Sequence, residues 1–319
     1  MGLSRVAVVG SGYMGGGIAQ TLALAGCTVR LGDLDAQTAR AAYERLVAQA
    51  AAFERDGLFP AGAEDAMRER LAPAASIEDA VSDAEYVTEA VPEVREIKAA
   101  VLGRISAGTA GAIIGTNTSA IPITELAAFV ENPERFLGVH WMNPAPFVPA
   151  IELIPGPTTR PEAIDEVEEL MRQAGKRPAQ VSDSPGFVAN RLQFALYREA
   201  VLMIEEGLAT PEQIDTVVSN AFGFRLALFG PFAIGDMAGL DVYNSSYLSL
   251  EAEYGARLAA PRSLVEAVAA GRLGIKSGGG GFLDIDADAV PALLEYRDRA
   301  YAKLSALRAE LGTAPGLPS

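Results

Sequence analysis

The feature that most constrains the fold is a glycine-rich turn close to the start of the chain. Residues 6–9 form a short apolar run, and the sequence GSGYMG follows it at residues 10–15. Residues 18–25 then have the composition of a helix, which we expect to stop at Gly26. An apolar run, a turn with this glycine spacing and a helix are typical of the first crossover unit of a parallel sheet. The chain is therefore predicted to begin with an α/β domain.

The same turn has the features of a dinucleotide site. Its first glycine permits a tight turn, its second lets the backbone approach a pyrophosphate, and its third permits close packing of helix on strand. The helix N-terminus adds partial positive charge and free N–H groups. The predicted cofactor-binding residues of this segment are Gly10, Gly12, Met14 and Gly15.

Asp33 lies about 20 residues after the turn, at the end of the second predicted strand, where a carboxylate can bond the 2′-hydroxyl of a ribose. The alternative is that it is an ordinary surface aspartate. Leu34 and Asp35 follow it and offer no cation for a 2′-phosphate. We therefore expect NAD, rather than NADP, as the cofactor.

Short β-branched runs alternate with helical patterns over the first 180 residues, as in a parallel sheet with crossover helices. Further strands are expected at residues 28–31, 85–90, 112–115, 136–139 and 151–154, and further helices at residues 36–55, 93–105 and 161–174. From residue 185 onward the pattern is almost wholly helical. The prediction is an α/β Rossmann-type N-terminal domain over residues 1–183, an all-α C-terminal domain over residues 184–311, and a disordered tail over residues 312–319.

Composition narrows the classes of partner and of chemistry. The formal net charge of −15 argues against binding to nucleic acid or to an anionic membrane. No apolar run reaches the roughly 18–20 residues that a transmembrane helix needs, and no secretory signal pattern is visible, so we expect a cytoplasmic protein. Cys27 is the only cysteine and His140 the only histidine, which excludes an intrachain disulfide and disfavours a zinc site. No metal site is predicted.

His140 follows the predicted strand at residues 136–139, and open α/β sheets bind ligands at such strand ends. A histidine there is more often structural than catalytic, but its neighbours favour a catalytic role. Glu152 is the only acid in the apolar run 151–154, and a carboxylate in such a strand is costly unless it has a partner. A hydrogen bond to His140 would orient the ring and stabilise its protonated form, as a base in alcohol oxidation requires. The alternative for Glu152 is a side chain that reaches solvent at a strand edge.

Asn190 belongs to the segment 187–204, which is apolar on most faces and indicates a helix buried within a domain or in a subunit interface. Phe187 and Phe194 place Asn190 on an apolar stripe of that helix. A buried amide there needs a partner, which could be a helix cap, a backbone carbonyl or a substrate oxygen.

With these residues in place, the chain resembles the L-3-hydroxyacyl-CoA dehydrogenase family over nearly its whole length. The motifs occur in the family's order: VAVVGSGYMGGGIAQ, TEAVPEVREIK, NTSAIPI, HWMNPAPFVPAIEL, DSPGFVANR and GPFAIGDMAGLD. The resemblance implies NAD-dependent oxidation of a secondary alcohol on a small-molecule substrate, and a homodimer formed through the C-terminal domain.

The resemblance also implies roles for individual residues. Glu152 would steady His140 in a catalytic pair, with Ser119 and Asn190 near the substrate oxygens. Further cofactor contacts are implied at Glu93, Lys98, Asn143 and Lys276. For both lysines, a solvated surface position is an equal alternative.

The substrate stays open between branches of this family. In the acyl-CoA enzymes, the helical region after the second strand is rich in lysine and helps to grip coenzyme A, whereas residues 36–73 here contain no lysine. The segment AFERDGLFPAG at residues 52–62 is similar to relatives that act on small free hydroxy acids, such as L-gulonate 3-dehydrogenase and lambda-crystallin. The cations of this region are Arg40, Arg45, Arg55, Arg68 and Arg70, interleaved with acids.

Three hypotheses follow. A 3-hydroxyacyl-CoA substrate leads because of the overall motif match, and a small free hydroxy acid of the gulonate, carnitine or pyridine carboxylate type comes second. The third is a non-catalytic NAD-binding structural protein, as lambda-crystallins became. The presence of His140, Glu152 and Asn190 disfavours the third.

Overall fold

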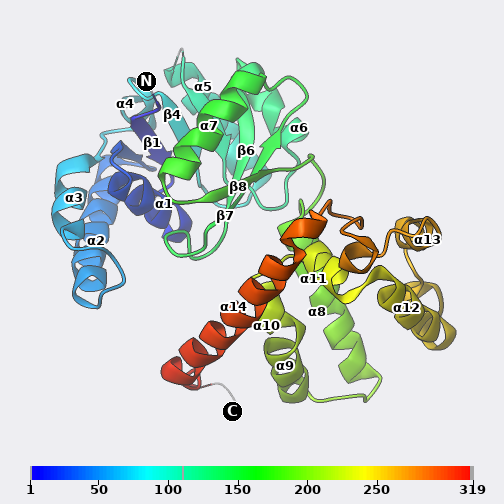
Figure 1. The fold of residues 1–319 in the computed structure, drawn as a ribbon. Helices are drawn as coiled ribbons and strands as arrows, with labels where there is room; N and C mark the ends of the chain where they lie inside the picture. Colours follow the sequence, from blue (N-terminus) through cyan, green and yellow to red (C-terminus); the bar gives the residue numbers. More distant parts are fainter. Residues whose placement is uncertain (1, 110, 317–319) are drawn as a thin grey trace. The chain divides into compact units, whose positions relative to one another are not determined.

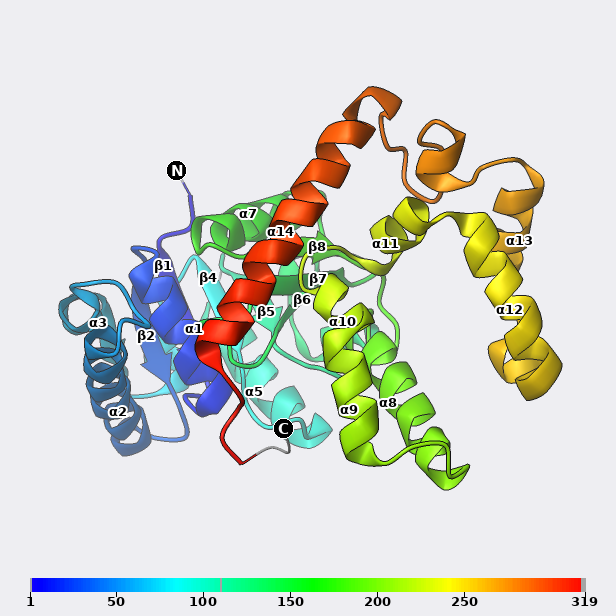
Figure 2. The same ribbon diagram turned by 60° about the horizontal axis from the view of Figure 1, so that its bottom comes forward.

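The computed structural model describes residues 2–109 and 111–316 of the 319-residue chain. The chain divides into two compact units, residues 1–196 and 197–319 (Figure 1). A mostly parallel sheet with helices fills the first unit, and helices dominate the second (Figures 1 and 2). The predicted α/β Rossmann-type N-terminal domain and all-α C-terminal domain are therefore confirmed as fold classes.

The sheet of the first unit has eight strands in the order β3-β2-β1-β4-β5-β6-β7-β8. The order of the first six is that of a doubly wound dinucleotide-binding sheet. The strands are β1 (Arg5–Val9), β2 (Thr28–Gly32), β3 (Leu71–Pro73), β4 (Tyr86–Glu89), β5 (Ile113–Thr116), β6 (Phe136–Trp141), β7 (Ala150–Pro155) and β8 (Arg177–Gln180).

Alternation along the strands supplies a core on each face of the sheet. In β1, Val6 and Val8 belong to one buried cluster and Ala7 and Val9 to the other, because successive side chains point to opposite faces. The first cluster is covered by α1 (Tyr13–Leu24), α2 (Ala36–Arg55), α3 (Ala63–Arg70) and α7 (Pro161–Gln173). The second is covered by α4 (Ile77–Val81), α5 (Arg95–Gly108) and α6 (Ile123–Leu126).

One pair of strands departs from the predicted parallel arrangement. Strands β6 and β7 pair antiparallel, with His140 opposite Glu152. The physical reason is the connection, since residues 142–149 are too few for a crossover, which needs about a dozen residues or more. His140 also lies within β6 rather than after its end, because the strand continues to Trp141.

Two strands were not predicted, and both are short strands at an edge of the sheet. β8 has the sequence RPAQ, which lacks an apolar alternation, and its residues are exposed or half-buried. β3 has only three residues. Hydrophobic periodicity cannot reveal strands of this kind, because neither buries a full face.

The second unit contains α9 (Pro211–Asn220), α10 (Phe222–Leu226), α11 (Pro231–Ala238), α12 (Leu240–Tyr254), α13 (Arg262–Ala269) and α14 (Val290–Leu311). The long helix α14 packs beside α9 and α10. Its Tyr301 ring lies 5.6 Å from the ring of Phe224, and Arg308 donates to the carbonyl of Ser219 at 2.8 Å. Residues 317–319 of the predicted disordered tail lie outside the described residues.

The first unit ends at Leu196, within helix α8 (Ala189–Glu205). The domain boundary at residues 183 and 184 therefore stays a prediction. The interpretation of α8 as a helix buried within a domain is wrong, because none of its residues is buried and Phe194 is 61% exposed.

Within the described part of the chain, no helix is both long and apolar enough to cross a membrane.

Candidate functional site

The glycine turn between β1 and α1 is closed on one side and open on the other. Gly10 has φ +93°, and a Cβ at this residue would lie 2.8 Å from the backbone of Ala90. A Cβ at Gly15 would lie 1.8 Å from the carbonyl oxygen of Gly10, so the helix packs directly on the turn. A Cβ at Gly12 would meet no atom within 4 Å. The turn thus leaves space at the glycine that must admit a pyrophosphate, and its residues fit a dinucleotide.

Asp33 is fixed beside this turn. Its Oδ2 accepts hydrogen bonds from the backbone N–H of Ser11 at 2.7 Å and from the Ser11 hydroxyl, and its Oδ1 accepts from Leu34 N at 2.7 Å. A carboxylate has about four acceptor positions, so it can still accept a ribose hydroxyl. Arg45 also belongs here, since its guanidinium donates to the carbonyl of Ser11 at 2.6 Å. No pattern in the sequence predicts that this arginine of α2 reaches the turn.

A single cavity of about 1320 Å³ joins the glycine turn to the carboxyl ends of β4, β5 and β6. Asp33 lies at one part of its lining and His140 at another. The predicted site residues that line it are Gly10, Gly12, Met14, Asp33, Glu93, Ser119, His140, Asn143 and Asn190. Gly15, Glu152 and Lys98 do not line the cavity, but they contact Gly10, His140 and Glu93, which do.

His140 and Glu152 form a buried pair. The His140 Nδ1 lies 2.8 Å from Glu152 Oε2, and the two residues are 5% and 6% exposed. The other oxygen of Glu152 accepts from the backbone N–H groups of Val188 and Ala189, each at 2.9 Å. Burial raises the pKa of Glu152, but the hydrogen bonds from His140 and from these amides outweigh it and hold the pKa below its ordinary value. An ionised carboxylate at Nδ1 keeps the proton there, which leaves Nε2 free to accept one.

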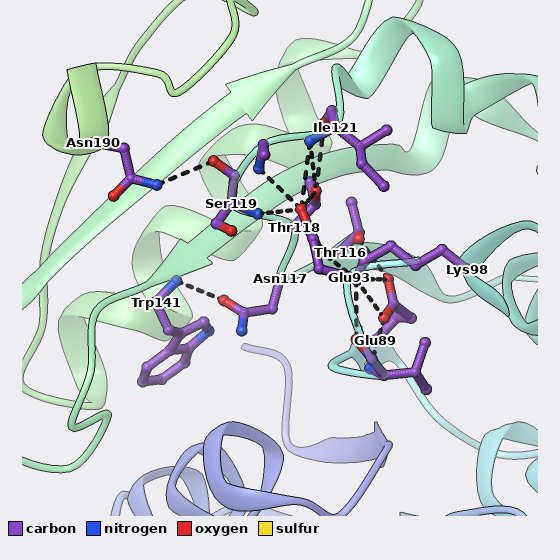
Figure 3. Close-up of polar contacts among 12 residues, drawn as sticks. Glu89, Glu93, Lys98, Thr116, Asn117, Thr118, Ser119, Ile121, Trp141 and Asn190 are labelled. Atoms are coloured by element: carbon purple, nitrogen blue, oxygen red, sulfur yellow. Dashed lines mark hydrogen bonds and ion pairs between the residues drawn. The ribbon is translucent and has the colours of Figure 1, made fainter. Parts of the chain in front are cut away.

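Ser119 and Asn190, which are far apart in the sequence, are in contact in the first unit. The Asn190 amide Nδ2 donates to the backbone carbonyl of Ser119 at 3.2 Å (Figure 3). Beside them, Asn117 accepts from the backbone N–H of Trp141 at 2.8 Å and lines the same cavity. Asn117 was not predicted as a site residue, although it is the first residue of the NTS motif. The roles of Ser119 and Asn190 toward the substrate stay predictions.

The two lysines with implied cofactor contacts differ. Lys98 is fully buried against Glu89, so the alternative of a solvated surface lysine is wrong for it. Lys98 does not line the cavity. Lys276 belongs to the second unit, where its ammonium lies 3.0 Å from Asp241 and is partly exposed. The cofactor contact of Lys276 stays a prediction.

The loop that joins β6 to β7 is held by a third lysine. The Lys176 ammonium donates to the carbonyls of Ala145 at 2.5 Å and Val148 at 2.9 Å, and it lies 5.4 Å from the centre of the Trp141 ring. Burial lowers the pKa of Lys176. Met142 and Asn143 of this loop line the cavity, and Lys176 holds the residues that follow them.

Replacing Lys176 with methionine should destabilise the first unit. The change leaves the buried carbonyl of Ala145 and the part-buried carbonyl of Val148 without the Lys176 donor, and an unsatisfied buried group typically costs about 1–3 kcal/mol. The midpoint of urea unfolding should fall, whereas Lys303→Met, at an exposed lysine of α14, should leave it unchanged. An unchanged midpoint in the Lys176 variant would show that water can replace the ammonium.

Comparison with known proteins places this site in a family. Residues 5–184 match the model of the NAD binding domain of 3-hydroxyacyl-CoA dehydrogenase, and residues 186–284 match that of its C-terminal domain. The chain is 39% identical over 284 residues to a 5-formyl-3-hydroxy-2-methylpyridine 4-carboxylate 5-dehydrogenase of Mesorhizobium japonicum, covering 88% of this chain and 90% of that protein. It is 36% identical over 284 residues to a probable 3-hydroxybutyryl-CoA dehydrogenase of Bacillus subtilis, covering 88% of this chain and 97% of that protein.

A solved structure agrees with these relatives. The 3-hydroxyacyl-CoA dehydrogenase of Archaeoglobus fulgidus superimposes with a TM-score of 0.79 at 30% identity, covering 95% of this chain and 99% of that one. The two domain models match in succession along the chain, and the relatives are of similar length. The glycine turn and Asp33 also fit an NAD-binding domain. The chain therefore belongs to the 3-hydroxyacyl-CoA dehydrogenase family and is an NAD-dependent dehydrogenase.

Proposed function

We propose that the protein oxidises the secondary alcohol of a 3-hydroxyacyl compound to a ketone, with His140 as the catalytic base. The observation that carries the proposal is the buried pair of His140 and Glu152 at the wall of the dinucleotide cavity. A base for this reaction needs a free nitrogen toward the substrate and a partner that stabilises the imidazolium, and this pair offers both.

The proposed chemistry divides the roles among four side chains. The His140 Nε2 takes the hydroxyl proton as the C–H hydride leaves and the carbonyl forms, and in the reverse direction it returns that proton. Glu152 stabilises the positive charge on the ring, and Ser119 and Asn190 hold the alcohol oxygen and the neighbouring carbonyl oxygen. NAD, when bound, supplies the hydride acceptor. The protein contributes positioning and electrostatic stabilisation.

A small free hydroxy acid without coenzyme A is the second candidate. Three of the five arginines in residues 36–73 are engaged by the protein itself: Arg45 with Ser11, Arg68 with Glu64, and Arg70 with the carbonyl of Ala23. The region therefore has few free cations for a polyanionic coenzyme. The Mesorhizobium japonicum relative, named for a pyridine carboxylate substrate, supports this candidate.

Aromatic packing around residues 52–62 also supports the small free hydroxy acid as substrate. The ring of Phe147, in the loop after β6, lies 5.6 Å from that of Phe53 and 6.0 Å from that of Phe59. Apolar rings, rather than lysines, therefore occupy this side of residues 52–62.

A panel of substrates tests both candidates. We would follow NADH absorbance with acetoacetyl-CoA, and NAD reduction with free L-3-hydroxybutyrate, L-gulonate, L-carnitine and a hydroxymethyl pyridine carboxylate. Turnover of the thioester supports the acyl-CoA candidate, and turnover of a free acid alone supports the second. NADH binding without turnover of any substrate would contradict both and favour the non-catalytic NAD-binding protein.

We also propose that the chain forms a homodimer through its C-terminal domain. Support comes from α8, where Leu192, Phe194 and Tyr197 are each more than half exposed. Apolar side chains gathered on one helix are typical of a protein interface. Sedimentation should show a dimer, and a stable monomer at micromolar concentration would contradict the proposal.

A further inference from the structure

The amino end of α1 is left open by the protein itself. Within the described residues, Gly12 gives this helix no side-chain cap and its first turn contains no acid, whereas the Asp35 side chain caps α2. The N–H groups of the first turn of a helix have no acceptor within the helix. In α1 they are therefore left for an anion in the cavity, which Gly12, Tyr13 and Met14 line.

One arginine reaches this end of α1 from the neighbouring helix. α1 and α2 cover the same face of the sheet (Figure 1). A Cβ at Gly16 would lie 2.8 Å from Leu46 Cδ2 and 3.6 Å from Arg45 Nη1, so the guanidinium lies beside the first turn of α1. The Arg45 Nη2 donates at 2.6 Å to the carbonyl of Ser11, the residue between the first two glycines of the turn.

Most of the hydrogen-bonding capacity of Arg45 is unused. A guanidinium has about five N–H donors in one plane, and the bond to Ser11 occupies one of them. Within the described part of the chain Arg45 forms no ion pair, and its side chain is exposed at the lining of the cavity. The hydrogen bond to Ser11 holds the side chain beside the turn, and the planar fork of an arginine matches the oxygens of a phosphate.

The rest of the lining supplies little positive charge. Among the described residues that line the cavity, Arg45 is the only lysine or arginine, and Asp33 and Glu93 are the acids. Lys98 lies 3.4 Å from Glu93, whereas Asp33 forms no ion pair within the described residues. A helix N-terminus contributes roughly half an elementary charge, which is less than the double negative charge of a dinucleotide pyrophosphate. The turn therefore needs a cation beside it, and Arg45 is the residue placed there.

We propose that Arg45 binds the pyrophosphate of NAD and supplies the positive charge that the glycine turn lacks. The contact with Ser11 separates this role from a role toward the substrate, because it places the guanidinium at the glycine turn, beside Asp33. Asp33 also disfavours a 2′-phosphate beside the same turn, since like charges repel. The inference goes beyond the proposed function and does not depend on which substrate is oxidised.

Arg45→Gln tests the proposal through the Kd for NADH, measured by fluorescence titration without substrate. We expect the Kd to rise by about 3- to 10-fold, because a charge-assisted contact is lost at an exposed position. Arg40→Gln is the matched control, since Arg40 is an exposed arginine of the same helix that does not line the cavity. Both variants lose one positive charge, and the Kd of the control should stay within about two-fold of wild type.

Two ligands that displace NADH locate the contact. ADP-ribose contains the pyrophosphate, whereas adenosine shares its adenine and ribose but has no phosphate. Arg45→Gln should weaken ADP-ribose by the same factor as NADH and leave adenosine within about two-fold of wild type. The ratio of the NADH Kd values of Arg45→Gln and Arg40→Gln should shrink at high salt, because ions screen an exposed charge pair. Arg45→Lys keeps the charge and should bind NADH more tightly than Arg45→Gln.

Four outcomes overturn the proposal. An unchanged Kd for NADH in Arg45→Gln would show that the pyrophosphate needs no arginine. Equal weakening of adenosine and ADP-ribose would show that Arg45 only maintains the shape of the turn. A loss confined to NADPH would place Arg45 at a 2′-phosphate, and an Arg45→Lys variant no better than Arg45→Gln would exclude a role for the charge. None of these measurements needs turnover, so their outcome is separate from that of the proposed reaction.

Discussion

Replacing His140 with glutamine should lower kcat by about 10²- to 10⁴-fold, the usual contribution of a positioned acid–base group. Glutamine can still donate a hydrogen bond to Glu152, so the buried carboxylate keeps a partner and the fold should persist. It cannot accept a proton at neutral pH, so the step assigned to Nε2 is lost. The Kd for NADH should stay within about two-fold of wild type, because the change removes an interaction needed only for the chemical step.

Steady-state kinetics and a fluorescence titration with NADH check this expectation together. A loss of kcat with unchanged NADH binding supports His140 as the base. A kcat close to that of wild type would show that another group accepts the proton. Since His140 is the only histidine in the chain, no second imidazole can substitute for it.

Replacing Glu152 with glutamine should have an effect of similar size, for a different reason. The amide oxygen can still accept from Val188 and Ala189, but the amide N–H₂ then faces His140 Nδ1. Nδ1 must become an acceptor, which moves the ring proton to Nε2 and blocks the nitrogen that should receive the substrate proton. We expect kcat to fall by about 10²- to 10⁴-fold, because the acid–base contribution is lost.

Nuclear magnetic resonance can report the tautomer of the His140 ring directly. The chain has one histidine, so no variant is needed to assign the imidazole signals. The wild-type ring should carry its proton at Nδ1 and the Glu152→Gln ring at Nε2. The double variant should be little slower than either single variant, since the two residues act as a unit. Normal kcat in Glu152→Gln, or an unchanged tautomer, would contradict the proposed pair.

The lowered pKa of Glu152 sets the pH range in which the pair exists. A carboxylate with a lowered pKa in the folded state contributes stability that is fully present above its unfolded pKa. That contribution is lost as the pH falls through the lowered value. The pair should therefore be intact throughout the neutral range and fail only in acid.

Much of the site could be predicted because its parts follow local rules. The glycine turn requires residues without a Cβ, and Asp33 follows at a spacing fixed by the crossover unit. Glu152 stood out as a lone acid in an apolar strand, and the structure places it 2.8 Å from His140. Each signal lies within a short stretch of sequence, where spacing alone carries the information.

The remaining features depend on contacts between distant segments. Arg45 reaches the glycine turn from α2, and Lys98 meets Glu89 and Glu93 through the folding of α5 onto the sheet. A lysine in sequence looks solvated unless its partners are known, so the burial of Lys98 could not be foreseen. The apolar faces of α8 predicted burial, but apolar composition cannot distinguish a core from an exposed face that awaits a partner.

The antiparallel pairing of β6 and β7 has a consequence for how such a protein can change. The distance between His140 and Glu152 is set by their opposition across two hydrogen-bonded strands, independent of the turn that joins them. Residues 144–148 can therefore vary in sequence while the proton-transfer pair keeps its geometry. The proton-transfer pair and the turn occupy separate stretches of one hairpin, so a lineage could remodel the turn without rebuilding the pair.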